Sequence, residues 1–314
     1  MRCLVTGGIG FIGSHVVKAL REAEHEVKVL DLDQRADYPV NICNASDVLR
    51  AVEDAQPKIV FHIAAIADAR KVLNNPVEGV NINLGGTASV LEGARRVGVK
   101  RVVLASTCWV ANAMGSGILD ESSMFLPTGG EHVYTTTKIA TEMMAHDFLA
   151  LYGLNFTILR YGIPYGPEMW PGLVLRNWLD RIAADKPIVI FGDGSASRRF
   201  LYIKDLAEAH VMALQEVATN QAYNLEGMRA ISLKELAEAF RRVWGRPIDI
   251  EYQPEPTRVG EFQYLRKIIS NAKAFVELGW EPKTDLEHGL RSTIDWYKNT
   301  ILEAQSTMQA SSQP

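Results

Sequence analysis

The sequence has 314 residues, of which 47% are apolar and 22% charged, and its formal net charge is −4. This length predicts two domains, or one large domain with an insertion. The small negative charge argues against nucleic acid or an anionic membrane as a partner. Three scattered cysteines (Cys3, Cys43 and Cys108) lack the spacing of a disulfide framework or a zinc site, so no metal is expected. With no signal-peptide core and no apolar run near twenty residues, the cytoplasm is the expected compartment.

The first sixteen residues hold a glycine-rich turn. Thr6–Gly13 reads T-G-G-I-G-F-I-G, between a predicted strand at Cys3–Val5 and a helix predicted to run to about Glu24. Strand, glycine turn and helix together are the context of the dinucleotide fingerprint. Without a Cβ, the turn lets a pyrophosphate reach backbone N–H groups at the helix N-terminus. The predicted cofactor contacts here are Gly7, Gly10, Phe11, Ile12 and Gly13.

An acid follows the glycine turn at the distance that dinucleotide binding requires. Glu26–Asp31 reads as a second strand that ends in a carboxylate. A carboxylate at this point accepts the ribose hydroxyls of NAD and repels the 2′-phosphate of NADP. NAD is therefore the predicted cofactor. The alternative is a glycine turn that only packs a helix on a strand, followed by a loop aspartate.

Strands and helices then alternate up to about residue 160. Buried strands are predicted at Lys58–Ala65, Lys100–Ser106 and Asn155–Arg160, and helices at Ala45–Asp54, Asn81–Arg96 and Glu131–Leu151. This alternation predicts an α/β fold with a Rossmann doubly wound parallel sheet. The small or apolar residues Ile63, Ala64 and Ala65 at a strand end leave room for a flat cofactor. His62 is more typical of a buried core histidine than of a ligand.

The amino-acid composition changes after Tyr161, where glycine, proline and aromatic residues dominate. We expect a smaller C-terminal α/β domain that binds the substrate. The predicted division assigns 1–161 to the cofactor domain, with 198–225 returning to it. Segments 162–197 and 226–304 form the substrate domain. Residues 305–314 have too little apolar content to pack and are expected to be disordered.

Tyr134 and Lys138 form the pair best suited to proton transfer. Four residues apart on a predicted helix, they lie on one face. An ammonium beside a phenol stabilises the phenolate and is expected to lower the tyrosine pKa. Tyr134 is therefore a candidate general base for a sugar or alcohol hydroxyl. An amphipathic helix with a lysine reaching to solvent is the alternative reading of this spacing.

A hydroxyl pair precedes this helix, at the predicted end of the fourth strand. Thr107 is placed to donate to the reacting oxygen or to relay its proton, and Ser106 competes for that role. Cys108 is a weaker candidate for a nucleophile, since no neighbour in sequence lowers its pKa.

The motifs together resemble those of the extended short-chain dehydrogenase/reductases, and within them the NAD-dependent sugar-nucleotide epimerases and dehydratases. The resemblance covers about residues 1–300. Besides the glycine turn and Asp31, it rests on H-I-A-A at 62–65, N-L-G-G-T at 83–87, S-T at 106–107, Y-T-T-T-K at 134–138, R-Y-G-I-P-Y-G-P at 160–167, F-G-D-G-S at 191–195, Arg198 and R-V-G-E at 258–261.

The resemblance implies a role for each matching position. Thr107, Tyr134 and Lys138 match the catalytic triad. For the cofactor it implies contacts from Asn41, Ile42, Asn83, Tyr161 and Pro164, besides Tyr134 and Lys138. For the substrate it implies base stacking by Phe191 and diphosphate binding by Arg198 and Arg258, besides contacts from Thr107 and Tyr134.

Departures from the family pattern bear on the reaction. Ile163 and Gly172 stand where asparagines commonly hold the sugar nucleotide. Cys108 and Trp109 follow Thr107, where 4,6-dehydratases and decarboxylases carry acids.

The resemblance then implies an isomerase, an epimerase of a nucleotide-diphosphate sugar at C4 (UDP-glucose/UDP-galactose type), through a transient keto-sugar. A homodimer paired through the helices at 81–96 and 131–151 is also implied. The alternatives are an NAD(H)-dependent reductase or dehydrogenase, or a non-catalytic NAD-binding regulator.

Overall fold

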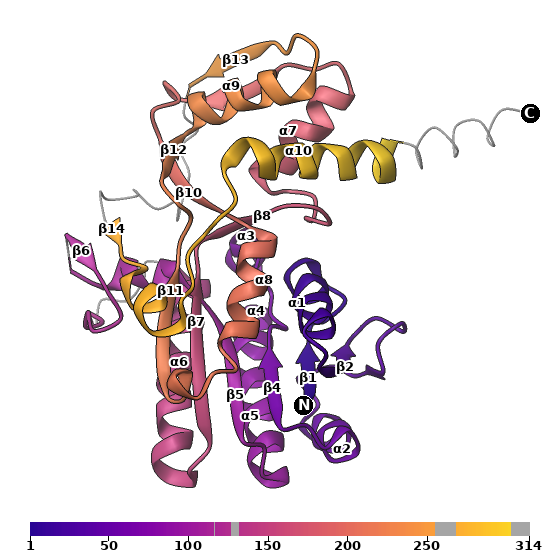
Figure 1. Cartoon of the computed structure of the whole chain (residues 1–314), viewed down its shortest axis with the longest axis vertical. Helices are drawn as coiled ribbons and strands as arrows, with labels where there is room; N and C mark the ends of the chain where they lie inside the picture. Colours follow the sequence, from indigo (N-terminus) through magenta and orange to yellow (C-terminus); the bar gives the residue numbers. More distant parts are fainter. Residues whose placement is uncertain (116, 127–131, 255–267, 303–314) are drawn as a thin grey trace, which may run out of the picture. The chain divides into compact units, whose positions relative to one another are not determined.

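The computed structural model describes residues 1–115, 117–126, 132–254 and 268–302 (Figure 1). The contact pattern divides the chain into two compact units. The first unit comprises Met1–Gly162, Leu206–Glu226 and Val259–Glu281. The second unit comprises Ile163–Asp205, Gly227–Arg258 and Pro282–Pro314. Each unit therefore collects segments that are far apart in the sequence.

The first unit is built on a seven-stranded parallel sheet in the order β11-β7-β5-β4-β1-β2-β3. Its strands are β1 (Arg2–Thr6), β2 (Glu26–Asp31), β3 (Tyr38–Pro39), β4 (Ile59–His62), β5 (Arg101–Thr107), β7 (Asn155–Tyr161) and β11 (Gln221–Leu225). Every neighbouring pair is parallel. The strand order reverses between β1 and β4, which is the switch point where ligands bind in doubly wound sheets. The predicted Rossmann fold is confirmed.

Helices connect these strands. They are α1 (Phe11–Glu22), α2 (Ala45–Ala55), α3 (Ala69–Asn74), α4 (Pro76–Val80), α5 (Gly86–Val97), α6 (Val133–Tyr152) and α8 (Ile203–Met212), with the shorter or irregular turns η1 (Asn81–Gly85), η2 (Cys108–Ala113), η3 (Glu216–Ala218) and η4 (Ala274–Leu278). The helix predicted over 81–96 thus begins as a π-helical turn. Left-handed glycines end α5 and α6, as expected for helix C-termini.

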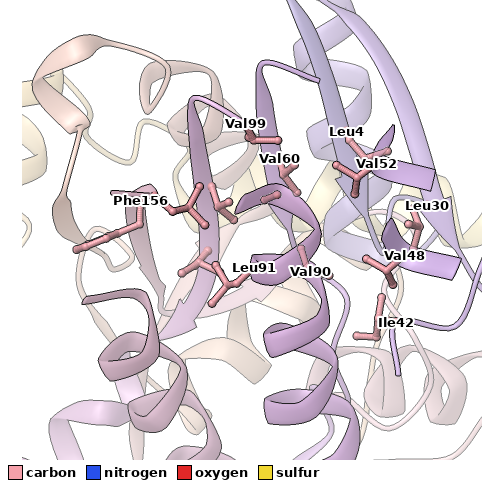
Figure 2. Close-up of a cluster of buried hydrophobic side chains, with 14 of the residues drawn as sticks. Leu4, Leu30, Ile42, Val48, Val52, Val60, Val90, Leu91, Val99 and Phe156 are labelled. Carbon is pink, nitrogen blue, oxygen red and sulfur yellow. The ribbon is translucent and has the colours of Figure 1, made fainter. Parts of the chain in front are cut away.

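One face of the sheet carries a hydrophobic core, drawn in Figure 2. Side chains from α2, α5 and α6 meet those of the strands there. Members with almost no exposed surface include Leu4, Leu30, Val48, Val60, Leu91 and Phe156. Burying such aliphatic side chains contributes roughly 1.5–3 kcal/mol each. The core therefore fixes the positions at which the strands end and the site begins.

The second unit is smaller and also mixes helices with strands. Its strands form two small sheets, β12-β10-β8 and β13-β9. The strands are β8 (Ile163–Tyr165), β9 (Ile188–Phe191), β10 (Ser197–Tyr202), β12 (Ala230–Ser232) and β13 (Ile250–Gln253), and the helices are α7 (Val174–Ala183), α9 (Leu233–Trp244), α10 (Leu286–Trp296) and η5 (Tyr297–Leu302). Trp178 of α7 packs edge-on against Phe240 of α9, with ring centroids 5.7 Å apart.

The division differs from the sequence expectation at two places. Residues 198–205 belong to the second unit rather than the first, because β10 pairs with β8 and β12. The described residues 268–281 belong to the first unit rather than the second. There, β14 (Ile268–Ile269) pairs with β6 (Ile118–Leu119). The predicted tail at 305–314 lies outside the described residues.

Candidate active site

The glycine turn between β1 and α1 is tightly packed from both sides. Gly7 has a left-handed φ of 72°, and a Cβ on it would lie 2.7 Å from the backbone nitrogen of Ala64. A Cβ on Gly13 would lie 2.0 Å from the carbonyl oxygen of Gly7. Gly10 is the N-cap of α1 and, among the described residues, no side chain caps it. A helix N-terminus beside a turn without Cβ atoms suits an anionic ligand, and the turn fits the pyrophosphate of a dinucleotide.

Asp31 lies beside this turn, as its place in the sequence predicts. Its Oδ2 accepts the Ile9 amide at 3.0 Å, and its Oδ1 accepts the Asp33 amide at 3.2 Å. These bonds hold the carboxylate at the end of β2, and each oxygen keeps a lone pair for a further donor. The arrangement fits a ribose diol and disfavours a phosphate on the same ribose.

His62 is buried beneath the turn and has a structural role. Its Nδ1 bonds the Thr6 hydroxyl at 2.8 Å and its Nε2 bonds the Thr87 hydroxyl at 2.9 Å. Burial, reinforced by the charge of Lys138, lowers the pKa of His62 to about 3. The imidazole is therefore neutral, and it joins β1, β4 and α5 as a core histidine.

Asn83 also acts from inside the protein. Its Oδ1 accepts the Ile66 amide at 2.7 Å, and its Nδ2 donates to the Ile66 carbonyl at 3.1 Å and to Thr137 at 3.4 Å. Only 1% of the residue is exposed. These bonds position the segment after β4, and a direct cofactor contact from Asn83 stays a prediction.

Thr107 and Tyr134 meet where β5 ends and α6 begins. A hydrogen bond joins the two side chains and acts to lower the pKa of Tyr134. The Thr107 oxygen also accepts the Trp109 amide at 3.2 Å. Because that bond uses an acceptor position, the hydroxyl hydrogen of Thr107 is available to donate to Tyr134. Such a donor stabilises a phenolate.

Ser106 faces the other way and is not the partner of Tyr134. Its hydroxyl donates to Glu142, which forms a buried ion pair with Arg160 at 2.7 Å. Cys108 is also excluded as a nucleophile, since its thiol donates to the Arg160 carbonyl and burial raises its pKa well above the usual value. Of the three residues, Thr107 is therefore the one that contacts Tyr134, and it stays our candidate.

Burial dominates the electrostatics of Tyr134 and Lys138. It raises the pKa of Tyr134 to about 12, against the opposing hydrogen bond from Thr107. It lowers the pKa of Lys138 to about 8, against the nearby charge of Glu142. The Lys138 ammonium donates to the Ala105 carbonyl at 2.9 Å. The net shift of the Tyr134 pKa is therefore upward, opposite to the lowering expected from Lys138.

The other predicted cofactor residues of the first unit lie at different depths. Ile63, Ala64 and Ala65 are partly exposed just after β4. Asn41 is exposed and accepts the Cys43 amide at 2.9 Å.

The Ile42 side chain is in the hydrophobic core, which leaves its main chain to meet a cofactor. The buried Tyr161 bonds His210 at 2.7 Å. In α1, Phe11 is buried and Ile12 is partly exposed.

The remaining predicted contacts belong to the second unit. Pro164 lies in β8, Phe191 ends β9 with 37% of its surface exposed, and Arg198 lies in β10. The Arg198 guanidinium donates to the Ser197 carbonyl at 2.8 Å. Arg258 lies outside the described residues.

Two features of the site were missed at the level of sequence. The first is the buried Ser106–Glu142–Arg160 network, which a carboxylate four residues after Lys138 could have indicated. The second is the contact of Trp109 and His132 with the Tyr134 ring. His132 is the N-cap of α6 and accepts the Tyr134 amide at 3.1 Å.

A polar cavity of about 430 Å³ lies beyond the buried network. Glu121, Glu142, Arg160 and Lys273 contribute to its wall, whereas the three predicted catalytic residues do not. We therefore place the candidate active site at Thr107 and Tyr134 rather than in this cavity.

Residues 3–225 match the NAD dependent epimerase/dehydratase family, and the chain belongs to this family. It is 30% identical to a putative UDP-glucose 4-epimerase of Methanocaldococcus jannaschii, over 94% of this chain and 98% of that relative. It is also 30% identical to a UDP-glucuronate 4-epimerase of Thermodesulfobacterium geofontis, over 95% of this chain and 96% of the relative. The UDP-glucose 4-epimerase of Thermotoga maritima, solved with UDP-glucose, superposes with a TM-score of 0.85 at 29% identity and covers 96% of this chain and 100% of its own.

These likenesses confirm the predicted family and NAD as its cofactor. They do not identify the reaction, because further relatives are named as decarboxylases and dehydratases.

In the part of the chain that the structure describes, no helix is long and apolar enough to cross a membrane. The same residues hold no cluster of three or more histidine, cysteine or acidic groups suited to a metal ion.

Proposed function

We propose that the protein epimerises a nucleotide-diphosphate sugar at C4, in the manner of UDP-glucose/UDP-galactose interconversion, through a transient keto-sugar. The observation that carries this proposal is the hydrogen bond between Thr107 and Tyr134, with Lys138 one helical turn further on. These groups supply the acid and base that a reversible alcohol oxidation needs.

Tyr134 and Thr107 have different roles in the proton transfer. Tyr134 takes the proton of the C4 hydroxyl and returns it after the sugar has turned. Thr107 donates to the tyrosine oxygen and fixes its position, while the Trp109 amide fixes Thr107. NAD, when bound on the glycine turn and Asp31, supplies the acceptor and donor of the electron pair at C4. The positive charge of bound NAD would oppose the effect of burial on the Tyr134 pKa.

The residues beside the triad favour epimerisation over elimination or decarboxylation. Both of those reactions call for a further acid or base near C5 of the sugar. Cys108 is a buried thiol with a raised pKa, and Trp109 has no titratable group. A C4 epimerisation needs no further group, so the triad is sufficient for it.

The proposal is tested on the purified protein without added cofactor. Bound nucleotide is released and identified, and UDP-glucose is incubated with the intact protein. We expect retained NAD and formation of UDP-galactose. Retained NAD without interconversion would move the assignment to another nucleotide sugar. Stoichiometric consumption of added NADH with a keto-sugar would replace the epimerase with a reductase.

We further propose that the protein is a cytoplasmic homodimer paired through the helices at 81–96 (η1 and α5) and 133–152 (α6). Both η1 and α5 pack on α6. The apolar side chains of Met143 (60% exposed) and Leu151 (70%) lie on α6, and Val77 (70%) lies on α4, which leads into η1. A second copy covering this surface would remove these side chains from water.

A further inference from the structure

Two aromatic rings pack against the reactive tyrosine of the first unit, those of Trp109 and His132. The Trp109 ring stands edge-on to the Tyr134 ring, with centroids 5.9 Å apart and an interplanar angle of 88°. His132 lies 6.5 Å from both rings, again edge-on. Tyr134 and His132 are buried, whereas Trp109 keeps part of its surface exposed. The indole is thus the member of the group that a ligand can reach most easily.

The backbone places this indole at the reactive end of Tyr134. The Trp109 amide and the Tyr134 phenol bond the same Thr107 hydroxyl, so Trp109 is tied to the oxygen that handles the proton. A sugar hydroxyl that gives its proton to Tyr134 must come within about 3 Å of that oxygen. The pyranose that carries the hydroxyl therefore lies next to the indole.

Two cations of the first unit near this point, among its described residues, already have partners. Lys138 donates to the Ala105 carbonyl, and Arg160 is paired with Glu142. Burial lowers the pKa of His132, which favours the neutral ring, and its Nδ1 accepts the Tyr134 amide. An indole offers apolar carbon and one N–H donor, but no positive charge. A carboxylate placed against this surface would lose hydration without gaining a paired cation.

We propose that Trp109 is a specificity-determining residue that selects a neutral hexose and rejects a hexuronic acid. This inference rests on the proposed function, because it assumes that the sugar reacts at Tyr134. It chooses between two classes of substrate that the relatives leave open, since UDP-glucose and UDP-glucuronate 4-epimerases match the chain at equal identity.

The test compares the NAD-loaded wild type with Trp109→Thr and Trp109→Phe. For each protein, kcat/KM is measured with UDP-glucose and with UDP-glucuronate, and the affinity for both ligands is measured by calorimetry. We expect the wild type to favour UDP-glucose by about 100-fold. Trp109→Thr should narrow that ratio at least about tenfold, and Trp109→Phe, which keeps an apolar ring, should preserve most of it. Thermal unfolding of each variant checks that the fold is retained.

The outcomes separate the inference from the proposed function. Equal kcat/KM for both substrates in the wild type, or an unchanged ratio in Trp109→Thr, overturns the role of Trp109. If the wild type turns over neither substrate, the proposed substrate of the C4 epimerase is wrong, and the affinities decide the inference. Tighter binding of UDP-glucose that depends on Trp109 supports it, and equal binding of the two ligands overturns it.

Discussion

The side chains of Thr107 and Tyr134 are hydrogen-bonded to each other, although 26 residues separate them in the sequence. The bond joins the end of β5 to the first turn of α6. The Trp109 amide occupies one acceptor position of the same hydroxyl, and the hydroxyl hydrogen of Thr107 can still be donated to the tyrosine. This one contact distinguishes the reactive hydroxyl from its neighbour Ser106.

Thr107→Ala is expected to lower kcat by about 100-fold, because the phenolate loses its donor. Thr107→Ser keeps a hydroxyl and should restore most of that loss. Ser106→Ala should leave kcat within a few-fold but lower the free energy of unfolding by about 1–3 kcal/mol, because Glu142 loses a buried donor. Steady-state kinetics and urea unfolding separate the two effects. A loss of kcat in Ser106→Ala as large as in Thr107→Ala would contradict this assignment.

Asp31→Ala should reduce the amount of NAD that purifies with the protein and weaken the affinity for NAD by at least about tenfold, because the ribose loses its acceptor. The preference over NADP should narrow as well, since the carboxylate that repels the 2′-phosphate is gone. Nucleotide quantification and fluorescence titration measure both. Asp33→Asn is the matched control, because Asp33 pairs with Arg35 at the surface. Equal affinity of the wild type for NAD and NADP would refute the role given to Asp31.

Buried histidines predict a specific loss of stability in acid. The pKa values of His62 and His210 are lowered by burial to about 3 and about 4, below the ordinary 6.5. The unfolded chain therefore binds protons that the folded chain does not, and stability falls as the pH drops from 6.5 toward these values. Each group contributes about 1.4 kcal/mol per pH unit to the free energy of unfolding in that window.

Replacement of His62 tests this pH dependence. His62→Gln should make the free energy of unfolding less steep between pH 6 and pH 4 by about 1.4 kcal/mol per unit. The exposed His288, changed to Gln, should leave the slope as it is in the wild type. Urea unfolding at several pH values gives the slopes. Identical slopes for His62→Gln and the wild type would mean that His62 is not buried in its neutral form.

The proposed dimer predicts that a charge on the α6 surface changes the mass in solution. Met143→Glu should convert the dimer into a monomer, because it places a carboxylate in an apolar interface. Met124→Glu, at a site that is 84% exposed outside α4 and α6, should leave the dimer intact. Light scattering during size-exclusion chromatography gives both masses. A monomeric wild type, or a dimer that survives Met143→Glu, would show that this surface has another role.

Local spacing explains which parts of the site could be predicted. The glycine turn and Asp31 flank one helix, and Tyr134 and Lys138 share another, so each group is encoded within a short stretch. The choice between Ser106 and Thr107 was not encoded locally. Successive residues of a strand point to opposite faces, and the face that binds Glu142 is decided by α6, which follows β5 only after a loop.

The unit boundaries were also difficult to predict, for a related reason. Short strands such as β10 and β14 belong to the unit that holds their pairing partner, and those partners lie far away in the sequence.

The net pKa of Tyr134 depends on how deeply the ring is buried, which the Y-x-x-x-K spacing does not specify. The presence of Lys138 one helical turn away therefore does not by itself predict a lowered pKa for Tyr134.

The most direct measurement follows the hydrogen at C4. The purified protein is given UDP-glucose deuterated at C4, without added cofactor, and the UDP-galactose formed is analysed by mass spectrometry and NMR. We predict full retention of deuterium at C4, because one bound cofactor removes and returns it, and no product from Tyr134→Phe above about 1% of the wild-type rate. Loss of the label to water, or unchanged turnover in Tyr134→Phe, would contradict oxidation and reduction of C4 by this site.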